Sequence, residues 1–203
     1  MISASAFILI GGNSKRFGTT KWQARINGKT VLERMWKSCD KFQERYLIGK
    51  DEYSDQKKPI LKDKLEIEAP INGLYTALDH SNTDWILLLS CDLPLIDEKI
   101  LGHLWSFVKP DRNIIIPEVN KGLQPTCAFY KKSLKDIVME QINNDSLGLI
   151  DLVRKIEYHP IDLTERSDYF LNMNTKNNGI FSFETKRNLV TNSSEFYNLS
   201  YDF

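Results

Sequence analysis

Apolar runs alternate with amphipathic stretches along this chain of 203 residues. Residues 6–10 and 85–89 are nearly continuous apolar runs, a pattern typical of buried strands. In 31–39 and 100–108, apolar residues recur three or four positions apart and predict helices with one buried face. The pattern therefore predicts strands and helices in alternation.

Shorter elements continue this alternation. Strands are predicted at 46–48, 113–116, 126–130 and 169–173, and helices at 73–78 and 133–142. Ser133 followed by Asp136 is typical of a capping box that opens the last of these helices. Residues 26–29, Ile-Asn-Gly-Lys, predict a hairpin turn.

Strands that alternate with helices indicate a mostly parallel sheet, because a helix normally makes the crossover between parallel strands. We expect an α/β fold, an open doubly wound Rossmann-like sheet, in one domain of residues 1–178. Residues 179–203 are rich in polar residues without clear periodicity, so we expect a tail there. In such sheets ligands bind beyond the carboxyl ends of the strands.

The overall composition is that of an ordinary globular protein. Lys plus Arg and Asp plus Glu both number 27, so no net charge steers the protein toward nucleic acid or a membrane surface. No apolar run approaches the roughly 20 residues of a membrane helix. Residues 1–10 lack the basic start of a signal peptide, so we expect a cytoplasmic protein. Cys39, Cys91 and Cys127 show neither disulfide nor zinc-site spacing.

A pair of glycines follows the first predicted strand. Gly11 and Gly12 let the backbone turn sharply and present N–H groups to an anion, since glycine has no side chain to block the approach. Arg16 and Lys21 would add positive charge for a polyphosphate. The local pattern alone also allows a plain glycine turn beside two solvated cations.

Two common phosphate-binding motifs are excluded by spacing. Gly28-Lys29-Thr30 resembles the end of a P-loop, but Gln23 occupies the required first glycine position. The dinucleotide fingerprint is absent because Gly11 and Gly12 are adjacent and the next glycine is Gly18.

An aspartate follows the apolar run of 85–89. Asp92 lies in the segment Leu-Ser-Cys-Asp-Leu-Pro, residues 89–94, where a strand end would place it at the ligand crevice. Mg²⁺ prefers one or two carboxylates together with phosphate oxygens and water. The alternative is a turn residue, or a cap for a helix that starts near Asp97.

The arrangement Gly-Gly-x-x-x-Arg-Phe-Gly-x-x-Lys after a strand resembles the molybdenum cofactor guanylyltransferases, which have a nucleotide-diphospho-sugar transferase type of fold. In that family the motif is Leu-Ala-Gly-Gly-x-x-x-Arg-Met-Gly; here Ile10 replaces the alanine and Phe17 the methionine. Five motifs occur in the family's order between residues 9 and 175.

The resemblance implies roles for particular residues. Asp92 matches the metal-binding aspartate of the family's Cys-Asp-x-Pro motif. Asp63 precedes residues 69–73, which resemble the family's Gly-Pro-Leu-Ala-Gly, and is the counterpart of a nucleotide-contacting aspartate; a surface aspartate in a lysine-rich stretch is the alternative. The family's base-contacting asparagine has no clear equivalent around Gly49-Lys50. The implied nucleotide-binding residues are Leu9, Ile10, Gly11, Gly12, Lys21, Asp63 and Asp92, with Arg16, Lys21 and Asp92 catalytic.

Two later motifs imply an acceptor site. Gln124 begins a segment similar to the family's Gln-Pro-Leu-x-Ala-x-Tyr strand, in which the glutamine faces the pterin side. Asn172 and Asn174 match Asn-x-Asn-Thr, and a strand would place both amides on one face. All three are therefore expected to bind the substrate.

The implied activity is transfer of GMP from GTP to molybdenum-loaded molybdopterin, with Mg²⁺ as cofactor and release of pyrophosphate. GTP and molybdopterin are the expected small-molecule partners. Transient contact with molybdoenzymes or other cofactor-biosynthesis proteins is also allowed, whereas nucleic acid and membrane are not expected. Alternatives are a transferase of the same fold that uses CTP or a sugar phosphate, and a nucleotide-binding module without catalysis.

Overall fold

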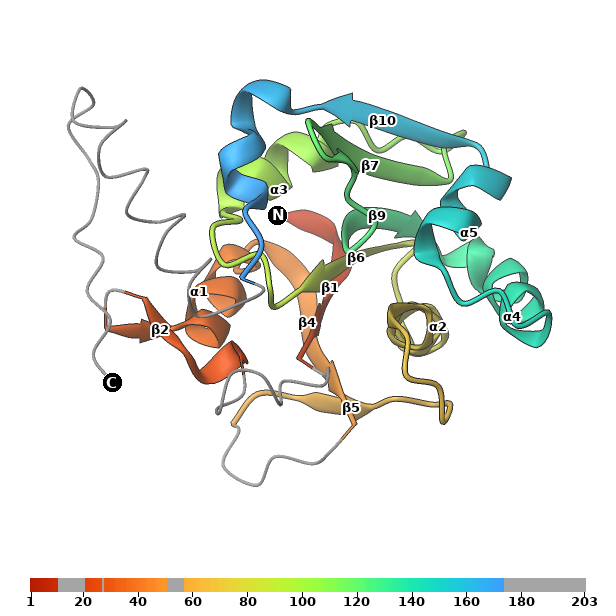
Figure 1. Ribbon diagram of the computed structural model, residues 1–203, viewed down its shortest axis with the longest axis horizontal. Coiled ribbons are helices and arrows are strands. Elements are labelled where there is room, and N and C mark those ends of the chain that lie inside the picture. The colour runs from red at the N-terminus through yellow and green to blue at the C-terminus, as the bar shows by residue number, and fades with distance from the viewer. Residues whose placement is uncertain (11–20, 27, 51–56, 174–203) are drawn as a thin grey trace.

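The computed structural model describes residues 1–10, 21–26, 28–50 and 57–173, and of Lys21 only the backbone. Helices cover both faces of a mixed sheet in this part of the chain (Figure 1). No helix among these residues is long and apolar enough to cross a membrane. The expected domain boundary at residue 178 and the tail of 179–203 lie outside the described residues.

The main sheet is open and mostly parallel, which confirms the expected fold class. Its strands lie side by side in the order β10 (Tyr158–Asp162), β7 (Ile114–Val119), β9 (Cys127–Lys131), β6 (Trp85–Ser90), β1 (Ile2–Leu9), β4 (Phe42–Gly49) and β5 (Ile60–Lys62). β9 runs antiparallel to both of its neighbours, while β6, β1, β4 and β5 are parallel. The short β8 (Gly122–Leu123) pairs with β7.

Each face of the sheet has its own hydrophobic core. Helices α1 (Val31–Ser38) and α3 (Glu98–Trp105) pack on one face, and α2 (Pro70–His80), α4 (Lys135–Asn143) and α5 (Leu149–Lys155) on the other (Figure 1). Successive strand side chains point to opposite faces, so Ala6 and Ile8 of β1 join the first core and Phe7 joins the second. A strand buried on both faces reads as a continuous apolar run.

Most predicted elements are present, with ends shifted by a few residues. The hairpin turn is confirmed: β2 (Arg25–Ile26) pairs antiparallel with β3 (Lys29–Thr30), and Gly28 has a positive φ of 72°. β5, α5 and β10 were not predicted, because each is short. In addition, Pro160 in β10 disfavours a central strand and is accommodated at the sheet edge.

The expected capping box at Ser133 and Asp136 is wrong. A 3₁₀ turn of residues Lys132–Leu134 precedes α4, and the Lys135 N–H donates to the Lys132 carbonyl within it. The N-cap of α4 is Leu134, which has no side-chain cap hydrogen bond. The tight turn therefore replaces the side-chain cap in satisfying the backbone.

The predicted strand at 169–173 is also wrong. A 3₁₀ helix of residues Thr164–Phe170 occupies its first part, and residues 171–173 lie outside the sheet. Phe170 and Met173 are both buried, three positions apart. That spacing belongs to a turn rather than to a strand, in which buried residues alternate.

Asn72 ties the loop before α2 to the helix. The side chain is buried; its Oδ1 accepts a hydrogen bond from the Leu65 N–H at 3.2 Å. Its Nδ2 donates to the carbonyls of Leu65 and Ile67 at 2.5 and 3.1 Å. Because these three bonds satisfy backbone groups of the half-buried residues Leu65 and Ile67, Asn72 fixes the path of the loop before α2.

Replacement of Asn72 by alanine should strand those backbone groups without partners. We expect Asn72→Ala to lower the free energy of unfolding by about 2–3 kcal/mol. The melting temperature should fall by roughly 4–12 °C in a thermal unfolding experiment. Asn143→Ala, at an exposed position at the end of α4, is the matched control and should change the free energy by less than about 0.5 kcal/mol. Equal melting temperatures for both variants would contradict this role of Asn72.

Candidate functional site

The carboxyl ends of four parallel strands meet at one edge of the sheet. Leu9 at the end of β1 is level with Ser90 of β6 and Ile48 of β4, and Gly49 is level with Lys62 of β5. Residues that directly follow these strands are therefore neighbours in space. This edge is where ligands bind in open α/β sheets.

The antiparallel β9 also contributes to this edge, through its first residues rather than its last. The Ser90 N–H donates to the Thr126 carbonyl at 2.8 Å, immediately before β9 begins. The segment 124–126 therefore lies beside the end of β6. Because β9 runs in the opposite direction, the motif that begins at Gln124 lies at the same edge as the ends of the parallel strands.

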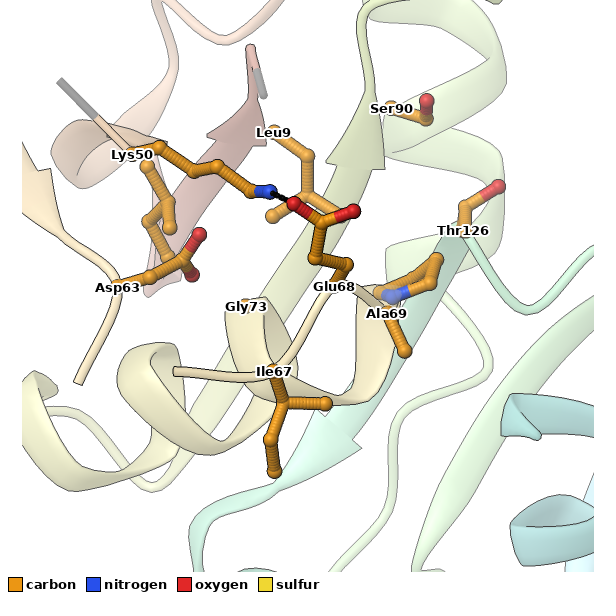
Figure 2. A pocket seen from close by; sticks show the side chains of 11 residues that line it. Leu9, Lys50, Asp63, Ile67, Glu68, Ala69, Gly73, Ser90 and Thr126 are labelled. Atoms are coloured by element: carbon orange, nitrogen blue, oxygen red, sulfur yellow. Dashed lines mark hydrogen bonds and ion pairs between the residues drawn. The ribbon is translucent and has the colours of Figure 1, made fainter. Parts of the chain in front are cut away.

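A pocket of about 240 Å³ opens at this edge between the ends of β1, β4 and β6 and the first turn of α2 (Figure 2). Drug-sized ligands usually occupy about 300–1,000 Å³. The pocket is therefore large enough for only a part of such a ligand. Leu9, Ile67 and Ala69 give it apolar surface, and Lys50, Asp63 and Glu68 give it charge.

Close contact between Leu9 and Gly73 shapes the wall of the pocket. A Cβ at position 73 would lie 2.4 Å from Leu9 Cδ2, so a larger residue would displace the leucine side chain. The absence of a side chain on Gly73 lets the first turn of α2 approach the end of β1. The helix start is thereby placed at the pocket.

Asp63 directly follows β5 and lines the pocket. Its N–H donates to the Gly49 carbonyl at 3.1 Å, which continues the pairing of β4 with β5. The side chain is half-buried, and its Oδ1 has no hydrogen-bond partner. Burial raises the pKa of the Asp63 carboxyl above its ordinary value, and the positive charge of Lys50 lowers it in part. A ligand with N–H donors would satisfy this oxygen.

Asp92 lies in the loop after β6. Its N–H donates to Ser90 Oγ at 3.5 Å, and its buried Oδ1 has no hydrogen-bond partner. It does not cap α3, because Asp97 is the N-cap and accepts a hydrogen bond from the Ile100 N–H at 2.9 Å. The capping alternative for Asp92 is therefore wrong.

The Asp92 carboxylate has the chemistry that a hard divalent cation requires. An unpartnered buried oxygen at the crevice suits Mg²⁺, which takes one or two protein carboxylates and completes its shell with water and phosphate oxygens. The described residues contain no group of three or more His, Cys, Asp or Glu side chains that could hold a metal. Mg²⁺ here would therefore share its coordination with a substrate.

The segment that carries Asn172 is attached to the Asp92 loop. The Met173 N–H donates to the Asp92 carbonyl at 2.8 Å, and the Met173 side chain is buried. Asn172 is exposed beside this bond. We expected the alternation of a strand to place Asn172 and Asn174 on one face. Because residues 171–173 are not a strand, that argument does not apply.

Gln124 lies in the turn between β8 and β9. Its backbone N–H donates to the Pro117 carbonyl at 2.9 Å, and its side-chain Nε2 donates to the Gly122 carbonyl at 3.0 Å. The side chain is half-buried. The amide therefore stabilises its own turn, and its oxygen is the atom that could accept from a substrate.

Several expected site residues lie outside the described residues. Leu9 and Ile10 are described: Leu9 ends β1, and the Ile10 N–H donates to the Ile48 carbonyl at 2.9 Å. The backbone of Lys21 opens a 3₁₀ turn of residues Lys21–Gln23. The positions outside the described part are Gly11, Gly12, Arg16, Asn174 and the side chain of Lys21.

Sequence reasoning missed Lys50 and Glu68. Lys50 directly follows β4, as Asp63 follows β5, and it forms an ion pair with Glu68 from the loop before α2. A strand was predicted at 46–48, so the rule that strand ends carry ligand-binding residues could have indicated Lys50. No sequence signal indicates Glu68, because its position depends on the path of the loop that Asn72 holds.

Comparison with known proteins agrees with this geometry. The sheet, with candidate ligand-binding residues at its strand ends, defines an open Rossmann-like α/β protein. Residues 6–157 match the family model described as the MobA-like NTP transferase domain, and the chain belongs to this family.

Relatives support the same assignment. A Clostridium perfringens protein named a probable molybdenum cofactor guanylyltransferase is 35% identical over 153 residues, covering 74% of this chain and 77% of its own. An Aquifex aeolicus protein of the same name is 34% identical over 177 residues, covering 85% and 86%. The resemblance seen in the motifs therefore extends over most of the chain.

Solved structures of other nucleotidyltransferases share the fold. The structure of molybdopterin-guanine dinucleotide biosynthesis protein A from Archaeoglobus fulgidus is similar with a TM-score of 0.77 at 20% identity, covering 91% of this chain and 99% of its own. For 2-C-methyl-D-erythritol 4-phosphate cytidylyltransferase from Thermus thermophilus, the TM-score is 0.67 at 8% identity, covering 89% and 98%. Because proteins named for different reactions have this fold, the fold alone does not select the base.

The raised pKa of Asp63 predicts a cost to stability. When the folded-state pKa exceeds the unfolded one, ionisation opposes folding, so stability falls as pH rises through the folded pKa. Asp63→Asn should therefore have a higher melting temperature than the wild type near pH 8, because the variant carries no charge that burial opposes.

The difference in melting temperature should disappear as pH falls below the ordinary pKa of an aspartate. There the Asp63 carboxyl is protonated in both the folded and the unfolded state. Thermal unfolding at a series of pH values measures the difference. Asp84→Asn, at an exposed site before β6, is the control and should change the melting temperature little at any pH. A less stable Asp63→Asn protein near pH 8 would show that the carboxylate stabilises the fold instead.

Proposed function

We propose that the protein transfers GMP from GTP to the phosphate of molybdenum-loaded molybdopterin, forming a guanine dinucleotide cofactor and releasing pyrophosphate. Membership of the MobA-like family and the names of its relatives support this reaction. The observation that carries the proposal is the pair of unpartnered carboxylate oxygens on Asp63 and Asp92, which follow β5 and β6 at one edge of the sheet, with β4 and β1 between them.

These two carboxylates have different tasks. Asp63, inside the pocket, accepts hydrogen bonds from the base of the nucleotide. Asp92, beyond the end of β6, would hold Mg²⁺ for the triphosphate of the nucleotide. Leu9 and Ile10 lead from the pocket toward Gly11 and Gly12, whose backbone receives the phosphates in this proposal.

The chemistry requires alignment and neutralisation of charge. A phosphate oxygen of molybdopterin forms a new bond to the α-phosphorus, and the bond from that phosphorus to the bridging oxygen breaks, so pyrophosphate leaves with the electron pair. No covalent intermediate with the enzyme is needed. Arg16 and Lys21 would balance the charge of the phosphates, and Asp92 is the residue that would hold Mg²⁺. When bound, Mg²⁺ supplies further charge neutralisation at the phosphate oxygens.

The acceptor lies on the β9 side of the edge. Gln124 stands in the turn before β9, and Asn172 neighbours the bond from Met173 to Asp92. With Asn174, these amides hold the pterin so that its phosphate faces the α-phosphorus. Nucleotide and acceptor thus meet at the end of β6. Transient contact with molybdoenzymes or other cofactor-biosynthesis proteins, which receive the product, belongs to this proposal.

A comparison of four nucleotides tests the reaction. Pyrophosphate release should be measured with GTP, ATP, CTP and UTP, each with and without molybdenum-loaded molybdopterin, in the presence of Mg²⁺. We expect release with GTP and the pterin together, and far less in every other combination. A preference for CTP would replace the guanylyl assignment by a cytidylyl one. Mg²⁺-dependent GTP binding without product would indicate a binding module.

Replacement of Asp92 tests the metal site. Asp92→Asn keeps the shape of the side chain but removes the negative charge that holds Mg²⁺. We expect kcat to fall by about 10²–10³-fold, the usual loss for one charge-stabilising group. Binding of Mn²⁺, followed by its electron paramagnetic resonance signal in the presence of GTP, should weaken in parallel.

Asp97→Asn is the matched control for that experiment. Asn caps a helix about as well as Asp, so this variant should retain both turnover and Mn²⁺ binding. Near-normal turnover of Asp92→Asn would contradict the role of Asp92.

A further inference from the structure

The pocket contains an ion pair that none of the motifs explains. Lys50 extends from the end of β4 and Glu68 from the loop before α2, and their charged groups meet across the pocket (Figure 2). Asp63 is the third charged residue of the pocket, and its Oδ1 has no partner although its carboxyl feels the charge of Lys50. The lysine therefore lies between two carboxylates and is bonded to the more exposed one.

The bond between Lys50 and Glu68 is weak enough to exchange. Their side chains are 43% and 70% exposed. Ion pairs so open to water contribute only about 0–1 kcal/mol, because water and salt screen the charges. A ligand that offers the ammonium group a good acceptor within the pocket can replace Glu68 at little cost.

The remaining groups match the edge of a guanine base. A carboxylate only accepts hydrogen bonds, and a lysine ammonium only donates them. Guanine presents N1–H and the N2 amino group as donors, with the O6 acceptor next to them. Adenine and cytosine place an amino group, a donor, at the position equivalent to O6, where a lysine would oppose it. Uracil offers a matching acceptor but only one N–H donor.

We propose that Lys50 selects guanine by donating a hydrogen bond to O6, while Asp63 accepts from N1 and N2, and that Glu68 holds Lys50 until the base enters. This inference rests on the proposed function and assigns the choice of base within it. Leu9 and Ile67 provide the apolar surface that the flat faces of a base require. Lys50 is thus a specificity-determining residue, and Glu68 positions it.

Binding of base analogues to the full chain, without the pterin, tests this assignment. Dissociation constants are measured by calorimetry with Mg²⁺ for GTP, 6-thio-GTP, ITP and ATP. 6-thio-GTP replaces only O6 by a weakly accepting sulfur, and ITP lacks only the N2 amino group. The wild type should bind GTP more tightly than the other three, because only GTP satisfies both Lys50 and Asp63 fully.

Lys50→Met removes the ammonium group and keeps most of the side-chain length. We expect GTP binding to weaken by about 10–100-fold, as for loss of a hydrogen bond to a charged group. The preference for GTP over 6-thio-GTP should disappear, whereas the preference for GTP over ITP should remain. A merely structural role or a general loss of charge would weaken all four triphosphates alike.

Two further variants complete the experiment. Glu68→Gln releases Lys50 and should strengthen GTP binding by up to about 5-fold without changing its preferences. Lys62→Met makes the same change of charge one residue before Asp63, outside the pocket, and should leave the preference for GTP over 6-thio-GTP intact.

Two results would overturn the assignment in different ways. Unchanged discrimination between GTP and 6-thio-GTP in Lys50→Met would refute the role of Lys50 alone. A wild-type protein that binds none of these triphosphates would refute it together with the proposed function.

Discussion

The level ends of four parallel strands are the constraint on which the candidate site depends. Hydrogen bonds continue beyond β1 on both sides: the Ile10 N–H donates to the Ile48 carbonyl, and the Cys91 N–H donates to the Leu9 carbonyl. The loops after β4, β1 and β6 therefore leave the sheet at one height. A one-residue shift of register in β4 or β5 would move Lys50 or Asp63 away from the pocket and turn the side chains of that strand to the other face of the sheet.

The two aspartates at this edge lack hydrogen-bond partners for one side-chain oxygen each, whereas the polar side chain that supports the loop before α2 is fully hydrogen-bonded. Asn72, behind the pocket, has bonds for both atoms of its amide. Asp63 and Asp92 each keep a buried oxygen without a partner. Such oxygens cost stability, and a site that must accept a ligand requires them. Asn72 therefore holds the loop, whereas Asp63 and Asp92 are the residues to which the proposed function assigns the nucleotide and Mg²⁺.

The end of β6 lies between two halves of the edge. On one side the ends of β1, β4 and β5 surround the pocket and Asp63; on the other, the turn before β9 carries Gln124. β6 lies between β1 and β9 and carries Asp92 beyond its end. In the proposed reaction the two substrates would meet at the end of β6, each held by one of these halves.

By itself, the sequence determined the fold class, the central strands and most helices. The runs of 6–10 and 85–89 are buried on both faces, so their apolar pattern is unbroken and could be read locally. It also indicated Asp92, which follows a predicted strand within a family-like motif, and it indicated Asp63 through the family resemblance alone. Local reading failed at 169–173, where the burial of Phe170 and Met173 follows a turn and not a strand.

Only the tertiary structure decided how distant segments combine. The meeting of Lys50 with Glu68, and the attachment of Met173 to Asp92, join residues that are far apart in the chain. No local pattern encodes such contacts, because they arise from strand order and from the loop path that Asn72 holds. Local propensities specify the elements, whereas packing of both sheet faces specifies which loops become neighbours.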